Sequence, residues 1–296
     1  MFTNSGIMEV LISPIVEACP TKSKSGMMSL LHSFYCWGQA GVVLISTIFF
    51  SLFGLDNWHF IALFWTIVPI VCMLLFSCAP IYTLDEQENG GSSAKALLTS
   101  KVFWVLVVMM ICSGASELAM AQWASAFAET VIGRSDLKWL TDLLGPCLFA
   151  ICMGGARVFY AKMSEKIDLT KGIFISSIIC IASYLIAVLS PLPVFSLVGC
   201  ALCGIGAGIM WPGSFSIATK KIPHGGVLMF GLLALSGDFG CLVGPSLAGQ
   251  VSALFGDDLR VGLMFSIIFP LILAIICGTM YFKNRAKKKS LEKQSD

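Results

Sequence analysis

The sequence predicts an all-α, polytopic membrane protein, in which a bundle of helices crosses a lipid bilayer. Of the 296 residues, 57% are hydrophobic and only 12% are charged, about half the roughly 25% charge of a soluble domain. Mean hydropathy is +0.87. So few charges cannot cover a globular surface in water, so most of the surface must face lipid. The net charge of +2 is too small to indicate a nucleic-acid partner.

Nine segments are long and apolar enough to cross the bilayer, which takes about 20 residues per helix. They are separated by clusters of charge and by breaks that contain Gly or Pro. We predict spans at 1–18, 28–52, 58–82, 102–130, 138–161, 172–190, 193–218, 226–254 and 261–283. The longest, 102–130, is expected to tilt or to extend beyond the bilayer.

The connecting segments alternate in basic charge, which predicts the orientation of the chain. One face carries 16 of the 19 Lys and Arg residues: Lys22, Lys24, Lys95, Lys101, Arg157, Lys162, Lys166, Lys171, Lys220, Lys221, Lys283, Arg285, Lys287, Lys288, Lys289 and Lys293. The other face carries only Arg134, Lys138 and Arg260. By the positive-inside rule, we expect a multi-pass protein of the cell membrane with a cytoplasmic C-terminus.

The longest polar segment predicts how the chain divides. Residues 83–100 are acidic and rich in Gly and Ser, a composition typical of a flexible linker. The linker would separate three helices in 1–82 from six helices in 101–283, and residues 284–296 form a basic cytoplasmic tail.

A weak internal repeat relates the two parts. With a shift of 202 positions, residues 6–8, 30–31 and 38 match residues 208–210, 232–233 and 240. The helices at 1–18 and 28–52 would then correspond to those at 193–218 and 226–254, as the fourth and fifth helices of a six-helix half. On this reading three helices are missing before Met1. The alternative is a genuine nine-helix protein with an external N-terminus.

Motifs for other classes of protein are not found in the sequence. Cys200 and Cys203 form a C-x-x-C pair inside an apolar helix, which favours packing over a metal site. No H-E-x-x-H, G-x-S-x-G or nucleotide-binding G-x-x-x-x-G-K-[ST] pattern occurs, and no filter loop of a channel is recognisable. We therefore expect no enzyme, no catalytic residues, no metal and no cofactor, and energy from a source other than ATP.

Four segments resemble the major facilitator superfamily, and within it the fucose–proton symporter-like group. The segment with Gly114, Ala115, Glu117 and Trp123 is similar to the group's seventh helix. The segment with Glu9, Ser13 and Pro14 is similar to its fourth helix, and the one with Pro212, Phe215 and Ser216 is similar to its tenth. Gly155 and Arg157 lie in a segment similar to the superfamily's Gly/Arg loop motif. Ser116 is an insertion, the loop motif lacks its leading Asp, and the acid of the group's first helix has no counterpart.

The resemblance implies a major facilitator fold that lacks the first three of twelve helices, with 1–82 equivalent to helices 4–6. It also implies a secondary active transporter that works by alternating access, is coupled to H⁺ and moves a small polar solute, with sugar indicated by the group. The alternative is a truncated remnant that does not transport. We expect a monomer in the lipid bilayer whose partners are the solute and H⁺.

Three acids lie deep in predicted spans, where a charge costs about 2.5–3.5 kcal/mol on insertion scales. By residue count, Glu9, Asp238 and Glu117 lie about 15, 18 and 22 Å from the cytoplasmic helix ends. Glu9 is the main candidate for proton coupling, because an apolar environment favours the protonated carboxyl; the alternative is a hydrogen bond to a neighbouring helix. We expect the solute cavity to be lined by Glu117, Gln122 and Trp123. Asp238 is either a second acid for proton coupling or the partner in a hydrogen bond between helices.

Arg157 lies near a cytoplasmic helix end, where snorkelling explains it. A gating ion pair with Glu165 or Asp168 is the functional alternative. His32 is a candidate proton relay, with a buried, hydrogen-bonded imidazole as the alternative. Pro212 is one of several candidate helix kinks.

Overall fold

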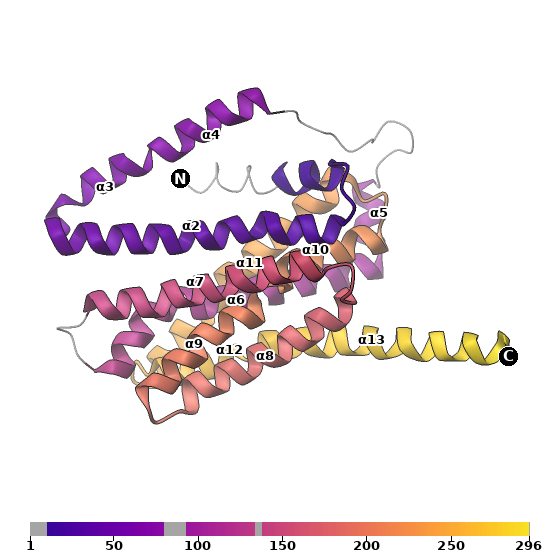
Figure 1. Cartoon of the computed structure of the whole chain (residues 1–296). Coiled ribbons are helices and arrows are strands. Elements are labelled where there is room, and N and C mark those ends of the chain that lie inside the picture. Colours follow the sequence, from indigo (N-terminus) through magenta and orange to yellow (C-terminus); the bar gives the residue numbers. More distant parts are fainter. Residues whose placement is uncertain (1–10, 80–92, 134–137, 296) are drawn as a thin grey trace.

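The computed structural model describes residues 11–79, 93–133 and 138–295, and it is a bundle of helices (Figure 1). Eight helices within these residues are long and apolar enough to cross a membrane. They are Lys24–Phe53, Leu55–Cys78, Lys101–Ile132, Leu143–Met163, Leu169–Leu189, Pro193–Lys221, Gly226–Leu254 and Leu259–Lys287. Each coincides with a predicted span. The remaining predicted span, 1–18, lies mainly outside the described residues. Its described part, residues 11–18, is helical.

The first group of helices comprises the helical residues 11–18 and α2 to α4. Helix α2, Lys24–Phe53, begins where the Ser23 hydroxyl accepts the Gly26 amide, a typical N-cap. A short 3₁₀ turn, η1 (Leu55–Asn57), leads into α3 (Trp58–Trp65) and α4 (Ile67–Cys78). These three elements form one apolar span, Leu55–Cys78.

The second group begins within the predicted linker, where α5 (Ala94–Thr99) forms a short helix. Helix α6 (Lys101–Ile132) follows, and then α7 (Lys138–Met163), which contains a proline. Helix α8 (Leu169–Leu189) begins where the Asp168 carboxylate accepts a backbone amide, as an N-cap acid does.

Two of the last three spans are interrupted. The predicted span 193–218 consists of α9 (Pro193–Ala207) and α10 (Met210–Lys221), which are separated by a two-residue break. Helix α11 (Gly226–Leu254) is continuous and contains a proline. The final span is divided into α12 (Leu259–Ser266) and α13 (Ile268–Ser295).

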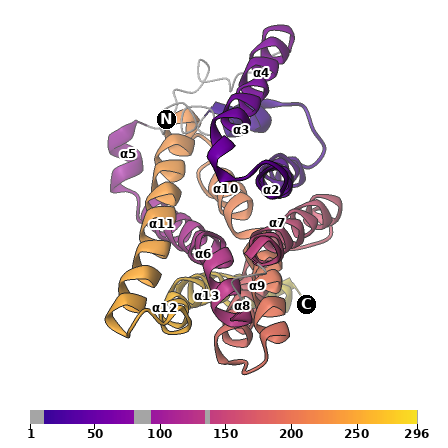
Figure 2. The same ribbon diagram turned by 90° about the vertical axis from the view of Figure 1, so that its left-hand side faces the viewer.

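Two groups of helices are visible in end view: α2, α3 and α4 on one side, and α6 to α13 on the other (Figure 2). Helix α2 joins the groups because it packs against α7 along their length and against α10 at one end. Ser23 and Ser164 share a hydrogen bond of 2.8 Å between their hydroxyls at this end. We call the contact of α2 with α7 and α10 the seam.

Within the second group, glycines allow α11 to lie directly on α6. A Cβ atom added to Gly240 would lie 2.1 Å from the Ile111 carbonyl oxygen, and one added to Gly244 would lie 2.5 Å from that of Ala115. No real Cβ fits at such distances, so the small residues set the helix separation.

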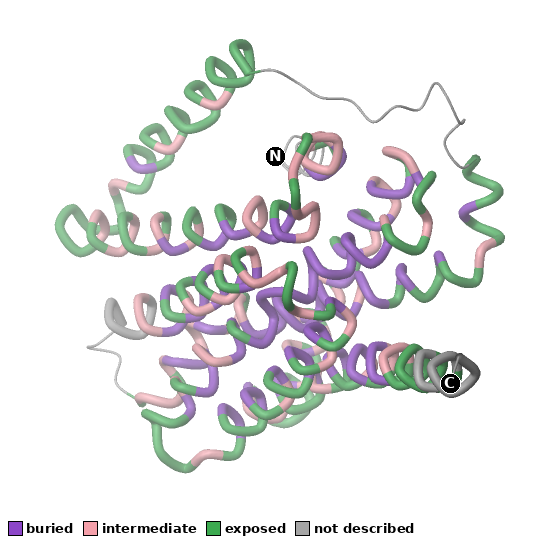
Figure 3. Tube along the Cα trace, turned by 45° about the vertical axis from the view of Figure 1, so that its right-hand side comes forward, coloured by how far each residue is buried: buried purple, intermediate pink, exposed green. Residues whose placement is uncertain are grey.

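Burial differs between the two groups (Figure 3). Purple, buried positions concentrate where α6, α7, α9, α10 and α11 meet, whereas α3 and α4 are green along most of their length. Only Ile61 is buried within those two helices. The exposed residues there are large and apolar, as expected of a surface in lipid rather than water.

Candidate functional site

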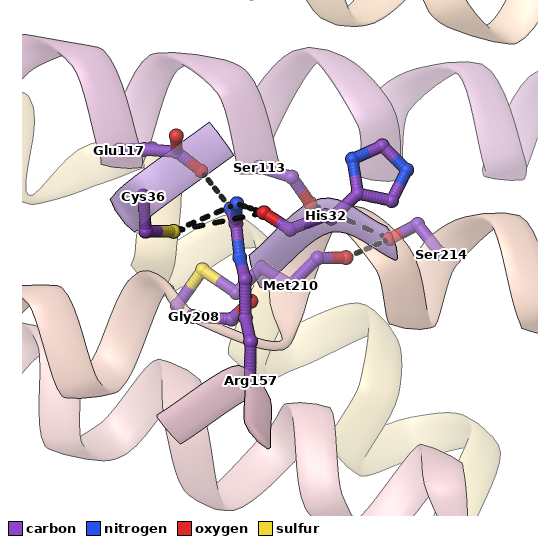
Figure 4. Close-up of polar contacts among 8 residues, drawn as sticks. All are labelled: His32, Cys36, Ser113, Glu117, Arg157, Gly208, Met210 and Ser214. Atoms are coloured by element: carbon purple, nitrogen blue, oxygen red, sulfur yellow. Dashed lines mark hydrogen bonds and ion pairs between the residues drawn. The ribbon is translucent and has the colours of Figure 1, made fainter. Parts of the chain in front are cut away.

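The centre of the molecule contains a buried arginine with a full set of partners (Figure 4). Arg157, on α7, is 2% exposed. Its Nη2 atom donates to Glu117 Oε2 on α6 at 2.8 Å, and its Nε atom donates to the Gly208 carbonyl at 2.7 Å. Its Nη1 atom donates to the His32 carbonyl at 2.8 Å and lies 3.2 Å from Cys36 Sγ, both on α2. One guanidinium therefore contacts three separate parts of the fold.

Glu117 is the carboxylate that balances this charge. It is 8% exposed, and small residues around it, Ala115, Ser116 and Ala119, are fully buried. An isolated charge in such a place is very unfavourable, so a buried pair persists only when its remaining polar atoms are also bonded. The carbonyl partners of Arg157 meet this requirement for the guanidinium.

The break between α9 and α10 supplies one of those carbonyls. In a regular helix, the Gly208 carbonyl would accept the amide of the residue four positions later, which here is Pro212 and has no N–H. Helical bonding continues before and after the break: the Gly208 amide donates to the Gly204 carbonyl, and the Gly213 amide donates to the Ile209 carbonyl. Pro212 cannot donate to the Gly208 carbonyl, and Arg157 Nε donates to it instead.

Further contacts of α2 residues surround Arg157. Ser29 Oγ donates to the backbone carbonyl of Arg157 at 2.8 Å. The Cys36 thiol lies 3.7 Å from the His32 carbonyl, which also accepts from Arg157. The His32 ring turns away from the guanidinium in Figure 4 and stacks on Phe215 of α10, with ring centroids 6.1 Å apart.

The structure corrects the expected surroundings of Arg157. Its head group does not snorkel to a surface but is buried, and it pairs with Glu117 in place of Glu165 or Asp168. Glu165 is exposed, and Asp168 accepts the Lys171 amide at 2.8 Å as the N-cap of α8.

The other candidate residues lie apart from this pair. Gln122 is exposed, and Trp123 Nε1 donates to the Pro245 carbonyl at 3.0 Å, which gives this tryptophan a role in helix packing. Asp238 is exposed and lines a 540 Å³ groove. The residues lining that groove are Ile111, Leu235, Ser236, Asp238, Phe239 and Leu242. Glu9 lies outside the described residues.

Sequence reasoning singled out Glu117, Arg157, His32 and Pro212 but missed Cys36 and Gly208. A signal for Gly208 exists in the sequence, because a proline four residues downstream leaves the carbonyl of that residue without its helical donor. Cys36 carries no comparable signal, since a thiol in an apolar helix is ordinary packing.

The chain resembles proteins of known class over nearly its whole length. A sequence model described as Major Facilitator Superfamily matches residues 2–229 and, in a second match, 148–296. "Membrane protein MosC" of Rhizobium meliloti is 23% identical over 279 residues, which cover 94% of this chain and 65% of that protein. The chain thus spans less than two thirds of that relative's length.

Two solved structures share the fold. The crystal structure of a variant of the E. coli fucose:proton symporter FucP matches with a TM-score of 0.73 and 17% identity, over 92% of this chain and 73% of that one. A structure of FucP in the outward conformation, described as a Major Facilitator Superfamily transporter, matches with a TM-score of 0.71 and 15% identity, over 92% and 72% of the two chains.

Proposed function

Because the chain belongs to the Major Facilitator Superfamily, we propose that it is a secondary active transporter that moves a small polar solute across the cell membrane by alternating access. A downhill proton drives the movement, and the C-terminus is cytoplasmic. Sugar is the solute class to test first, because the matched structures are of a fucose:proton symporter.

The proposal is supported by the buried ion pair of Arg157 and Glu117, which lies at the seam. Arg157 connects Glu117 in the second helix group to the His32 carbonyl in the first. Transport by alternating access requires the two groups to move relative to each other around a central site. A charged residue bonded to both groups is well placed to make that movement depend on protonation.

The coupling step follows from the charge balance. When Glu117 takes up a proton, its carboxyl becomes neutral and Arg157 keeps its positive charge. The guanidinium is then a buried charge without a counter-ion, which is strongly unfavourable. Movement of Arg157 toward water relieves this cost, and it breaks the bond to the His32 carbonyl and loosens the seam. Release of the proton restores the pair and closes the seam again.

Purified protein in liposomes tests the proposal. An inward proton gradient should drive accumulation of radiolabelled L-fucose, D-galactose or D-glucose. Glu117→Gln cannot gain or lose a proton, so it should retain exchange of solute across the membrane but lose gradient-driven accumulation. Asp56→Asn, in the exposed turn η1, serves as the control and should accumulate solute normally. Gradient-driven accumulation by Glu117→Gln at the wild-type level would remove Glu117 from coupling.

A further inference from the structure

Helices α2 and α11 are counterparts in the internal repeat. A shift of 202 positions carries the range of α2, Lys24–Phe53, onto residues 226–255, and α11 spans Gly226–Leu254. The spans that follow are each interrupted by one residue at places that match within one position, after Trp65 at the end of α3 and after Ser266 at the end of α12. Helices at equivalent places in a repeat are expected to pack against equivalent neighbours.

One face of α2 packs on α7 at the seam. Cys36 lies on this face, because an added Cβ at Gly154 of α7 would be 3.1 Å from Cys36 Cβ. Arg157 Nη1, also from α7, lies 3.2 Å from Cys36 Sγ. Ala40, one turn further along α2, belongs to a small cluster that includes two residues of α7. Helix α7 therefore covers this face of α2 and places an arginine opposite Cys36.

The corresponding face of α11 is bare. The repeat places Asp238 at the position of Cys36 and Leu242 at that of Ala40. Asp238 is exposed, and Leu235 and Leu242 on the same face are 65% and 64% exposed. All three line the 540 Å³ groove. Among the described residues, α11 packs mainly on α6 and α12, and no helix covers this groove in the way that α7 covers α2.

The acid in this groove limits what can cover it. Asp238 lies near the middle of a 29-residue span, where an acid that faces lipid is costly and is usually paired or turned toward protein. An apolar lipid tail offers no hydrogen-bond donor, whereas a basic side chain on a neighbouring helix does. The repeat indicates the same chemistry, because the residue opposite Cys36 is an arginine. A second copy of this chain suits the groove poorly, since its Arg157 is buried and already paired with Glu117.

We propose that α11 binds a membrane-spanning helix of a separate polypeptide, which lies in the groove and carries an arginine or lysine opposite Asp238. This helix takes the place on α11 that α7 takes on α2. The undescribed stretches 1–10, 80–92 and 134–137 do not supply it, because each is shorter than the about 20 residues that a span needs. The contact goes beyond the proposed function and does not rest on transport.

Binding of a synthetic helix to the full chain in liposomes tests the inference. The probe is a peptide of about 20 Leu and Ala residues with one central Arg and Lys at both ends, and its match has Leu in place of the Arg. Energy transfer from a fluorescent protein fused behind Asp296 to a dye on the peptide gives the Kd. The Arg peptide should bind more tightly than the Leu peptide. Asp238→Asn should raise the Kd of the Arg peptide about fivefold to thirtyfold, as loss of a polar contact between membrane helices does.

Moving the acid to another exposed helix face is the matched control. Ile178 of α8 is 48% exposed, so Ile178→Asp in the Asp238→Asn background keeps an acid in the membrane but takes it out of the groove. This variant should not restore the Kd. In the otherwise wild-type chain, p-benzoylphenylalanine at position 242 should crosslink to the Arg peptide under ultraviolet light, and the same residue at position 178 should not. Crosslinking locates the contact without relying on the folding of the Asn variant.

Equal Kd values for the Arg and Leu peptides, an unchanged Kd in Asp238→Asn, or full recovery when the acid is moved would each overturn the inference. So would energy transfer between two copies of the chain that Asp238→Asn abolishes, because a second copy would then be the occupant. The assay contains neither solute nor a proton gradient. Failure of peptide binding therefore leaves the proposed transport intact, and failure of uptake leaves the helix contact intact.

Discussion

Replacement of Arg157 by methionine should destabilise the protein by about 3–5 kcal/mol, the typical cost of removing one partner from a buried ion pair. Methionine fills a similar volume, so the loss comes from charge and hydrogen bonding rather than from a cavity. The Gly208 carbonyl also loses its donor, and an unpaired buried acceptor accounts for about 1–3 kcal/mol of such a loss.

A double-mutant cycle separates these two contributions. Glu117→Leu alone leaves the guanidinium unpaired and should cost about as much as Arg157→Met. Together, the two substitutions remove both charges, so the double variant should lose only about 1–3 kcal/mol, mainly at the Gly208 carbonyl. The free energy of unfolding is measured by far-UV circular dichroism as SDS displaces dodecylmaltoside in mixed micelles.

Arg260→Met is the control for loss of a bonded arginine. Arg260 Nη1 donates to the Val188 and Ser190 carbonyls, and the side chain is only partly buried, so its replacement should cost about 1 kcal/mol. Positions 117 and 157 should show an interaction free energy of about 3 kcal/mol or more. Additive losses in the double variant would refute it.

Three further predictions concern other parts of the molecule. Gly240→Ala should destabilise the protein by about 1–3 kcal/mol in the same unfolding assay, because the added Cβ meets the α6 backbone. The control Gly155→Ala should leave the stability unchanged, because nothing lies within 4 Å of a Cβ there. Equal losses in the two variants would contradict the helix contact. The double variant S23C/S164C should form a disulfide, because the two serine hydroxyls are 2.8 Å apart. This disulfide should lock the seam and abolish uptake, and dithiothreitol should restore uptake. Normal uptake by the oxidised form would show that the seam need not open. Glu9→Gln should abolish the pH dependence of uptake if Glu9 takes part in proton coupling, and unchanged pH dependence would exclude that role.

The spans could be predicted from the sequence because length and apolarity are local properties of each segment. Eight predicted helices coincide with described ones to within a few residues. Pro212 was singled out as a candidate kink, but the breaks at Thr66, Gly208 and Ile267 were not placed, because an apolar window remains apolar across an interruption of one or two residues. The short helix α5 was also missed, since Gly and Ser dominate the composition of the segment before it.

The ion pair shows where sequence reasoning stopped. Glu117 and Arg157 were both singled out, but they are 40 positions apart on different helices. Counting residues from the cytoplasmic ends puts Glu117 deep and Arg157 six residues before the end of α7, so the two seemed to lie at different depths. The structure brings Arg157 Nη2 to 2.8 Å from Glu117 Oε2, and a residue count gives neither the offset between two helices nor the direction of a side chain.

Helix α13 has a consequence for how the protein can be labelled. Its 28 residues span about 42 Å at 1.5 Å per residue, whereas the hydrocarbon core is about 30 Å thick. The last turns therefore extend beyond the bundle as an uninterrupted rod, as Figure 1 shows. A fluorescent protein fused behind Asp296 would sit at the end of a lever anchored in the second helix group, and would amplify any tilting of that group into a displacement measurable by energy transfer.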